Sequence, residues 1–282
     1  MVAVMSIIVL SSMPPLTKHI DVAGLALAAH RFVWLALLLL LVLVATGRRI
    51  TLRGLQLGWL PGLLFAGNIA LFYTAVKLTT VANATVLGAI QPVLSLLLVG
   101  PLFGEKVRRS EIAITVVAIA GVVIVVYGSS ITPVWSPRGD VLAFLATLLW
   151  TAYLVVAKRA RSELTAIELQ TVLTLVAAVL IVPVALVSGQ SVAVPRADWW
   201  WLALLVVVPG AGHTLVNWAH GHTPLVLVSM LFLLNPVVAT GLAALFLGES
   251  VNGFQIAGML LVLGSLGVLM VRLHRSRERI VT

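Results

Sequence analysis

The sequence contains no cysteine and few charged residues. Its 282 residues include 9 acidic side chains, and charges of both signs make up only 10% of the chain. The lack of cysteine excludes disulfide bonds, thiolate metal sites and cysteine nucleophiles. The sequence also has no HExxH motif, no GxSxG motif and no cluster of acids, which are arrangements that hydrolytic enzymes use. We therefore expect a protein that is not an enzyme and that has no bound metal or cofactor.

Apolar residues, in contrast, make up 61% of the chain, far more than a water-soluble protein of this length requires. They form segments that recur from end to end, each with roughly the 17 to 25 residues that cross a bilayer as a helix. We therefore predict an all-α integral membrane protein with ten transmembrane helices. The predicted spans lie near residues 1–16, 22–46, 55–78, 81–103, 110–128, 139–157, 165–187, 198–219, 224–247 and 253–272.

The first predicted span is shorter than the others. Residues 1–15 contain no basic segment before Lys18 and no small-residue cleavage pattern, so we interpret them as a membrane span and not as a signal peptide. Two explanations of the length stay open. Either the helix is tilted and incomplete, or the sequence starts inside a longer helix.

The basic residues lie in short clusters between the apolar segments. If the N-terminus is cytoplasmic, 13 of the 18 Lys and Arg residues fall in inside segments, 4 fall in outside segments, and Arg31 lies within a span. The positive-inside rule then places both termini in the cytoplasm, with the chain in a plasma (inner) membrane. The formal charge of +9 is thereby explained as a topology signal, and we expect the lipid bilayer, not nucleic acid, as the partner.

One motif occurs twice at a constant distance. Pro92 and Pro236 are 144 positions apart, and so are Glu105 and Glu249. This distance is close to half the chain length, which indicates two copies of a five-span unit. The predicted organisation is a first repeat over residues 1–128, a periplasmic or extracellular linker over 129–138, a second repeat over 139–272 and a cytoplasmic tail over 273–282.

A repeat with an odd number of spans must enter the bilayer from the opposite side in its second copy. The two halves are then related by an axis in the membrane plane and enclose a cavity near its middle. Rocking one half on the other exposes that cavity to each side in turn. The repeat therefore predicts a secondary transporter with alternating access.

Four sequence features point to a known family. They are QP at Gln91–Pro92 and NP at Asn235–Pro236, the Gly-Glu that ends each of these runs, the segment YTAVKLTTVANATVL at 73–87, and the segment NWAHGHTPLVLVSML at 217–231. Over nearly its whole length the chain resembles the EamA-type, ten-helix members of the drug/metabolite transporter superfamily. This resemblance implies a ten-helix bundle that exports or imports small metabolites, commonly amino acids or toxic organic compounds. The chain departs from the family in its first helix, which is shorter and lacks an early aromatic residue.

The two proline motifs are the first candidate site. Pro92 and Pro236 lie inside apolar spans, where each removes a backbone hydrogen bond and frees a carbonyl group. A broken helix in the middle of the membrane is a natural ligand site, and Gln91 and Asn235 stand beside the two breaks. The alternative is that both prolines only kink helices for packing.

Span eight contains a second polar group of residues. His213, Asn217 and His220 follow one another at i, i+4 and i+7, which places them on one face of a helix. We expect His213 and Asn217 to face the cavity or to bond a neighbouring helix, and His220 to be solvated near the cytoplasmic end. Histidine is the side chain here that titrates near neutral pH, so proton coupling is a further hypothesis, although no acidic partner is evident.

Five further residues complete the candidate substrate site. Arg31 is costly inside a membrane, so its guanidinium must face water or a partner; the alternative is a structural role at helix ends or backbone carbonyls. The others supply amide, hydroxyl or aromatic groups for a small-molecule substrate, unless they serve only packing: Asn68, Tyr73, Trp150 and Tyr153. The family resemblance favours Trp150, because in that family the sixth helix contributes an aromatic residue to the central cavity.

The remaining polar and small residues are interpreted as structural. Glu105 and Glu249 each stand at a helix end, so we expect them to be solvated or to bond between repeats. Gly58 and Gly62 belong to a small-residue stripe in span three that permits close helix contact. An intramembrane enzyme, a channel and a non-transporting receptor are the alternatives to a transporter.

Overall fold

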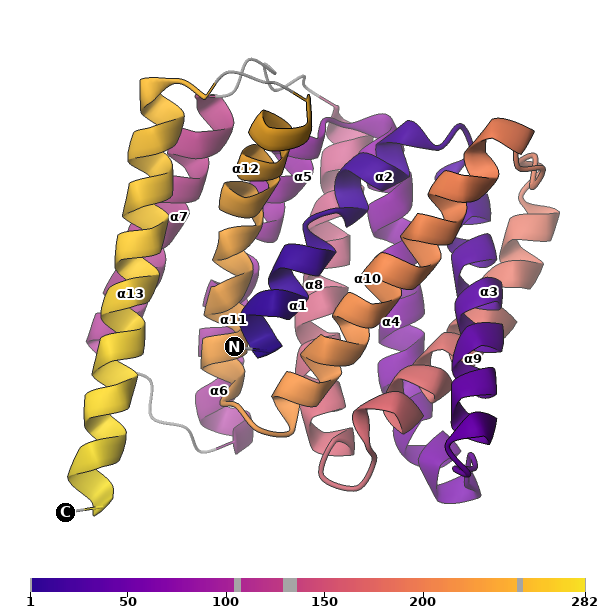
Figure 1. Cartoon of the computed structure of the whole chain (residues 1–282), viewed down its shortest axis with the longest axis horizontal. Coiled ribbons are helices and arrows are strands. Elements are labelled where there is room, and N and C mark those ends of the chain that lie inside the picture. Colours follow the sequence, from indigo (N-terminus) through magenta and orange to yellow (C-terminus); the bar gives the residue numbers. More distant parts are fainter. Residues whose placement is uncertain (1, 104–107, 129–135, 248–250, 282) are drawn as a thin grey trace.

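The computed structural model describes residues 2–103, 108–128, 136–247 and 251–281. Within these ranges the chain forms helices joined by short connections, and no strand (Figure 1). The helices are α1 (Val2–Leu10), α2 (Met13–His19), α3 (Gly24–Ala45), α4 (Leu52–Leu78), α5 (Val81–Gly88), α6 (Gln91–Phe103), α7 (Arg109–Tyr127), α8 (Pro137–Ala160), α9 (Ala166–Val187), the 3-10 helix η1 (Arg196–Asp198), α10 (Trp199–His220), α11 (Leu225–Leu231), the 3-10 helix η2 (Phe232–Leu234), α12 (Asn235–Leu247) and α13 (Gly253–Val281).

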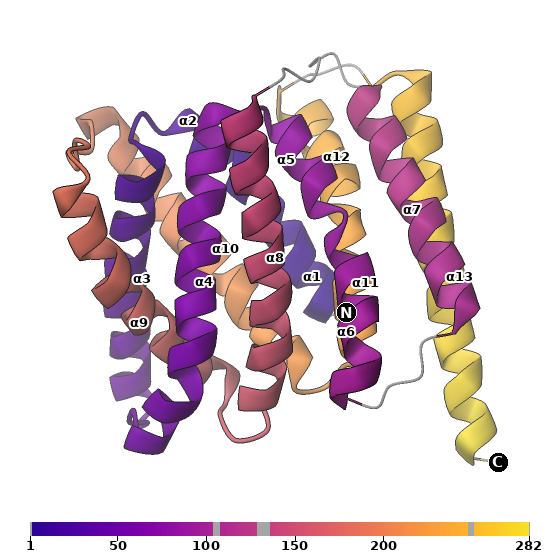
Figure 2. The same cartoon turned by 180° about the vertical axis from the view of Figure 1, so that it is seen from behind.

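Seven helices in the described ranges are long and apolar enough to cross a membrane. They are α3, α4, α7, α8, α9, α10 with η1, and α13 as far as Arg272. Three other predicted spans are built from shorter helices that follow one another: α1 with α2, α5 with α6, and α11 with η2 and α12 (Figure 2). The predicted class, an all-α membrane protein, is confirmed.

The helix ends lie close to the predicted span ends. Each predicted boundary within the described ranges lies within three residues of a helix end, except at the C-terminus. There α13 continues to Val281, through most of the segment predicted as a tail. Lys, Arg and Glu are good helix formers, so a charged segment can extend a helix beyond the bilayer.

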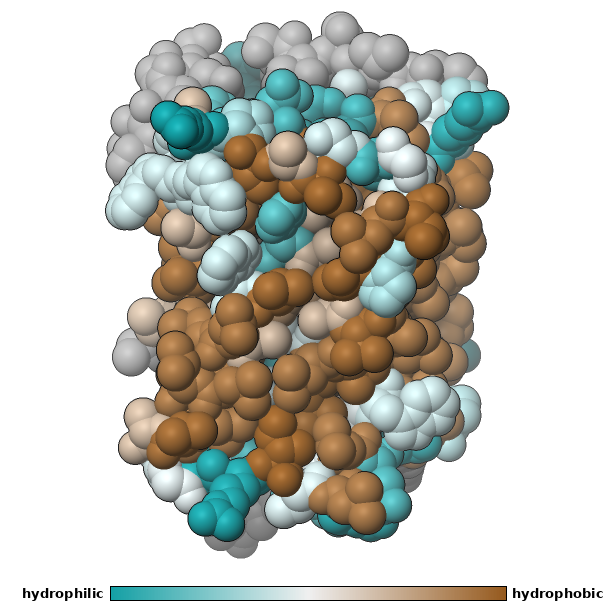
Figure 3. Space-filling model, turned by 90° about the vertical axis from the view of Figure 1, so that its right-hand side faces the viewer, coloured by the Kyte–Doolittle hydropathy of each residue, from teal (hydrophilic) through white to brown (hydrophobic). Residues whose placement is uncertain are grey.

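The outer surface carries a wide apolar belt between polar ends (Figure 3). On it, Leu41 of α3 and Val179 and Leu186 of α9 are 68%, 72% and 63% exposed. Such exposure of large apolar side chains is unfavourable in water and favourable in hydrocarbon. The belt therefore marks the surface that faces lipid.

Helix α4 lies inside the bundle and packs against both α8 and α9. Its small residues permit this close approach: a Cβ atom at Gly62 would lie 2.8 Å from Cβ of Val176, and a Cβ atom at Gly58 would meet Val172. The small-residue stripe predicted in this span therefore faces α9. Close approach without a bulky side chain is the usual means by which membrane helices gain contact area.

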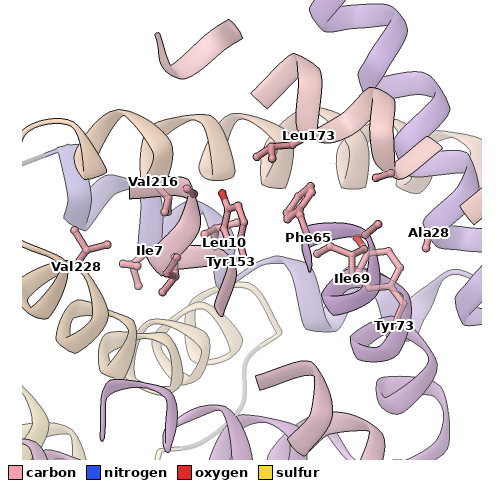
Figure 4. Close-up of a cluster of buried hydrophobic side chains, with 14 of the residues drawn as sticks. Ile7, Leu10, Ala28, Phe65, Ile69, Tyr73, Tyr153, Leu173, Val216 and Val228 are labelled. Carbon is pink, nitrogen blue, oxygen red and sulfur yellow. The ribbon is translucent and has the colours of Figure 1, made fainter. Parts of the chain in front are cut away.

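The core lies where α1, α4, α8 and α10 meet (Figure 4). Phe65 of α4 stacks on Tyr153 of α8 with ring centroids 5.3 Å apart, and both are fully buried. Leu10 of α1 and Val216 of α10 belong to the same cluster. This packed region fixes the helices that carry the candidate site.

Candidate functional site

Three interrupted helices meet around one cavity. Regular α-helix is interrupted between α1 and α2, between α5 and α6, and at the 3-10 helix η2 between α11 and α12. A cavity of about 150 Å³ lies between these interruptions and the sides of α4, α8 and α10. It is lined by Leu10, Ser11, Met13, Pro14, Pro15, Asn68, Phe72, Ala84, Thr85, Gly88, Ala89, Gln91, Ala146, Thr147, Trp150, His213, Phe232, Leu233, Asn235, Pro236 and Ala239.

Proline explains where the helices restart. Pro14, Pro92 and Pro236 each stand in the first turn of a helix, which are α2, α6 and α12. Proline is tolerated there because the first N–H groups of a helix have no partner within it. It cannot donate to the preceding turn, so the two helix segments do not join. Pro236 lines the cavity, whereas Pro92 lies one position beyond the lining residue Gln91.

Gln91 and Asn235, the residues beside the predicted breaks, both line the cavity. The Gln91 amide nitrogen donates to the hydroxyls of Ser95 at 2.7 Å and Ser229 at 3.1 Å, while its carbonyl oxygen is buried without a partner. The Asn235 carbonyl oxygen lies 2.8 Å from the Ser11 hydroxyl, which is also 2.8 Å from the carbonyl oxygen of Ile7. One hydroxyl proton cannot serve both acceptors at once. Both cavity amides therefore have spare acceptor capacity.

His213, Asn68 and Trp150 form another part of the wall. His213 is 2% exposed, and neither ring nitrogen has a hydrogen-bond partner in the described structure. Its ring contacts Phe65 and Trp150 edge to face, with centroids 4.9 and 5.5 Å apart. Asn68 donates its amide to the carbonyl of Ala146 at 2.9 Å. The wall thus combines aromatic faces with polar groups that a bound solute can satisfy.

Tyr153 and Asn217 lie outside the cavity lining and bond to each other. The Tyr153 hydroxyl donates to the Asn217 side-chain oxygen at 2.8 Å, and the Asn217 amide donates to the Gln170 side-chain oxygen at 2.7 Å. Gln170 donates in turn to Thr174 at 3.3 Å. This buried chain connects α8, α10 and α9. Sequence reasoning did not select Gln170 and Thr174, although their i, i+4 spacing in an apolar span is the same signal that selected His213 and Asn217.

Arg31 and Tyr73 form a separate buried pair. The Arg31 side chain is fully buried, and its Nη1 donates to the Tyr73 hydroxyl at 2.9 Å. The same nitrogen lies 3.4 Å from the sulfur of Met13, a cavity-lining residue. Nε and Nη2 have no partner in the described structure. Inserting an arginine at the centre of a membrane helix costs about 3 kcal/mol. Arg31 therefore differs from the apolar residues that pack around it, whose burial carries no such cost.

The structure corrects one expectation in span eight. His220 was expected to be solvated, but it is 3% exposed and its ring nitrogens are unpartnered. The connection after α8 covers this end of α10, where Arg161 donates to the backbone carbonyl of Asn217 at 2.7 Å and packs against Gly221. His220 is therefore enclosed, and it does not line the cavity.

Polar contacts close the bundle at the end where α3 ends and α4 begins, which we call the basic end. Arg48 pairs with Glu168 at 3.1 Å, and Arg53 pairs with Glu163 at 3.0 Å. Glu168 also accepts from the backbone and hydroxyl of Thr165 as part of a capping box. These contacts join the start of α4 to the connection between α8 and α9.

At the opposite end of the bundle, Asp140 accepts from the Thr79 hydroxyl at 2.7 Å and from the Asn83 amide at 3.1 Å. Lys18 donates to the backbone carbonyl of Val76 at 2.9 Å. These bonds join α2, α4, α5 and α8 beyond the cavity. Glu105 and Glu249, expected to be solvated or to bond between repeats, lie outside the described residues.

An apolar helical bundle whose interrupted helices surround a mostly apolar cavity with a few polar side chains is typical of a multi-pass membrane transporter. The chain matches the EamA-like transporter family over residues 1–127 and 137–271, and it belongs to that family. The predicted resemblance is confirmed, and with it a transporter in place of an enzyme.

One curated protein and one solved structure are similar to this chain over most of its length. An uncharacterized transporter of Bacillus subtilis (strain 168), YyaM, is 24% identical in an alignment of 267 positions that covers 89% of this chain and 87% of the relative. A solved structure described as "Crystal structure of protein" superposes with a TM-score of 0.81 at 20% identity, covering 97% of this chain and 96% of its own. The second likeness supports the fold alone.

Proposed function

We propose that this protein is a secondary transporter that exports small organic metabolites, such as amino acids or drugs, by alternating access. The cavity between the interrupted helices carries this proposal. It contains unsatisfied polar groups in an apolar bundle, where leaving them without a ligand or water is costly. A mobile solute that completes these bonds at the centre of the bundle is what a carrier requires.

The packing of the helices supports an inverted repeat. The residue offset of 144 relates α4 to α10, and it relates the α1–α2 segment to α8. In agreement, α4 packs on α8 while α10 packs on α1, and the equivalent helices α7 and α13 pack on each other. If the three segments of short helices each cross once, the chain has ten crossings, in repeats over 1–128 and 139–272.

The direction of the interrupted helices also fits inversion. Figures 1 and 2 show that α6 ends at the basic end of the bundle and that α12, its equivalent, ends at the opposite end. The two interrupted segments meet where α11, which precedes α12, contacts α6. An antiparallel pair of broken helices around a central site is the arrangement of alternating-access carriers.

We assign direct solute contact to the candidate residues that line the cavity, with Arg31 and Tyr73 behind its wall. The direct group is Gln91, Asn235, His213, Asn68 and Trp150. Tyr153 and Asn217 act through the packing of α8, α9 and α10. Pro92 and Pro236 keep the helices interrupted.

The proposal is tested by transport into liposomes. Purified protein is first screened by thermal shift against amino acids and organic cations, since a ligand of the folded state raises its apparent stability. Gln91→Ala combined with Asn235→Ala should reduce flux of a stabilising solute by at least about tenfold, because two hydrogen-bonding groups are lost. Membrane insertion should be unchanged.

The matched control removes two amides outside the cavity. Gln56 and Gln190 are exposed, so Gln56→Ala with Gln190→Ala should transport as the wild type does. Equal flux in the cavity variant and this control would remove Gln91 and Asn235 from the site. A wild type that moves no solute under any imposed gradient would contradict transport itself.

A further inference from the structure

The positive charge of Arg31 is not balanced by any acidic side chain in the described structure. Its bonds run only to a hydroxyl and a thioether, from Nη1 to Tyr73 and Met13. The ion pairs of the described residues lie elsewhere, at Arg48 and Arg53 near the basic end. A buried guanidinium with free N–H groups needs an anion or water as its partner.

Arg31 stands directly behind the cavity wall. Met13 is one of the residues that line the cavity, and its sulfur lies 3.4 Å from Nη1 of Arg31. Met13 begins α2 immediately after an interruption of the helix, and methionine is flexible with a weakly accepting sulfur. Because the Met13 side chain is unbranched with three rotatable bonds, it can change rotamer at little cost.

We propose that Arg31 anchors a carboxylate subsite, with Met13 as its displaceable cover, so that the transported solute is a small carboxylate. This inference rests on the proposed transport function. The planar guanidinium presents its N–H groups as a fork that matches the two oxygens of a carboxylate. Nε and Nη2, the two free nitrogens, form one edge of that fork.

The charge of the cavity favours a monoanion. No Lys, Arg, Asp or Glu of the described residues lines it, and Arg31 contacts the lining residue Met13 from behind. One monoanion neutralises one guanidinium, whereas a phosphate dianion would leave an unbalanced charge in an apolar bundle. Phe72 and Trp150 supply aromatic surface for the rest of the solute.

The first test uses the wild-type protein and matched ligands. Acetate, butyrate and phenylacetate are each compared with their own primary amide by thermal shift and by quenching of tryptophan fluorescence in detergent. The carboxylate and the amide of a pair differ little in shape, so a difference reports the charge. At least one acid should bind at least about tenfold more tightly than its amide. If no acid exceeds its amide, the subsite does not exist.

The second test changes the guanidinium and its cover. Arg31→Gln should abolish the preference for the acid, and Arg31→Lys should keep it with weaker binding, because the charge remains without the planar fork. Met13→Ala should strengthen acid binding by removing the cover. Arg53→Gln, which removes an exposed arginine at the basic end, should bind as the wild type does. If Arg31→Gln kept the preference for the acid, the assignment of the subsite would be overturned. If Arg31→Gln fails to fold, Met13→Ala still tests the assignment, and unchanged or weaker acid binding in Met13→Ala would then contradict it.

These outcomes separate the subsite from transport. Liposome flux of neutral solutes that does not depend on Arg31 would leave the carrier in place and remove the carboxylate subsite. Arg31-dependent binding of acids without flux under any gradient would keep the subsite and contradict the transporter.

Discussion

Polar residues inside the bundle fall into two groups according to whether their hydrogen bonds are complete. Tyr153, Asn217 and Gln170 satisfy one another across three helices. Gln91 and His213 keep unpartnered atoms at the cavity. Buried polar atoms are normally paired, so we interpret unpartnered atoms at the cavity as sites of ligand contact and the satisfied chain as structural; His220 is also unpartnered among the described residues but does not line the cavity.

Tyr153→Phe tests this division. The change removes one hydroxyl and leaves the Asn217 oxygen without its donor, which should lower the free energy of unfolding by about 1 kcal/mol, the usual range for interhelical bonds in membranes. Transport should be retained, because Tyr153 does not line the cavity. Unfolding in a detergent titration and liposome flux measure the two effects.

The remaining tyrosine of the chain, which is neither Tyr153 nor the partner of Arg31, provides the control. Tyr127 is 67% exposed at the end of α7, so Tyr127→Phe should change neither quantity. If Tyr153→Phe abolished flux at unchanged stability, its hydroxyl would act on the solute, and the two groups would not be distinct.

The sequence was sufficient to select these polar residues but not to divide them. A polar residue in an apolar span is visible at once, and its i, i+4 neighbours follow from helical geometry. Asn217 could face either the cavity or Gln170, and the outcome depends on how α9 and α10 pack. Arg31 and Tyr73 are 42 positions apart in the sequence, on two different helices, so their pairing also depends on helix packing. The burial of His220 was missed for the same reason, since a neighbouring connection covers it.

At the scale of elements, α7 and α13 form a closely packed pair at one side of the bundle (Figures 1 and 2). A Cβ atom at Gly258 would lie 2.7 Å from the carbonyl oxygen of Gly121, and one at Gly121 would lie 2.9 Å from that of Gly258. The two backbones therefore touch at a reciprocal crossing. Such small-residue crossings stabilise membrane helix pairs by close van der Waals contact.

Gly258→Ala should destabilise this pair. The added methyl meets backbone that cannot rotate away, so the free energy of unfolding should fall by about 1 to 3 kcal/mol, as for other overpacked contacts. Gly264→Ala is the control in the same helix, because no atom lies within 4 Å of its added methyl. It should be neutral or slightly stabilising. Equal stability of both variants would show that the helices separate without cost.

The elements were predicted well where the length and apolar content of a segment determine whether it forms a membrane-spanning helix. The long helices end near the predicted positions because polar connections bound them. The interruption between α1 and α2 was not predicted, although Pro14 and Pro15 follow Ser11 and Ser12. The repeated motifs at Pro92 and Pro236 predicted two broken helices at the cavity. The break between α1 and α2 has no repeated motif, so the repeat pattern did not reveal it.

At the scale of the whole molecule, the proposed inverted repeat requires the two halves of the bundle to run in opposite directions. The equivalent helices α7 and α13 begin at opposite ends of the bundle, as Figure 1 shows. Most Lys and Arg residues of the described ranges lie at the end where α7 begins: in or beside the α3–α4 and α8–α9 connections, at the start of α7 and in the last third of α13. From the positive-inside rule we predict that this end faces the cytoplasm.

Single cysteines test this orientation directly, because the natural chain has none to react. Arg108 and Asn252 occupy equivalent positions before α7 and α13, 144 residues apart, and both are exposed. Asn252→Cys should react with a membrane-impermeant maleimide in intact cells, whereas Arg108→Cys should react only after permeabilisation, because an odd number of crossings separates the two positions. Reaction of both in intact cells would place them on one surface, which parallel repeats would produce and inverted repeats cannot.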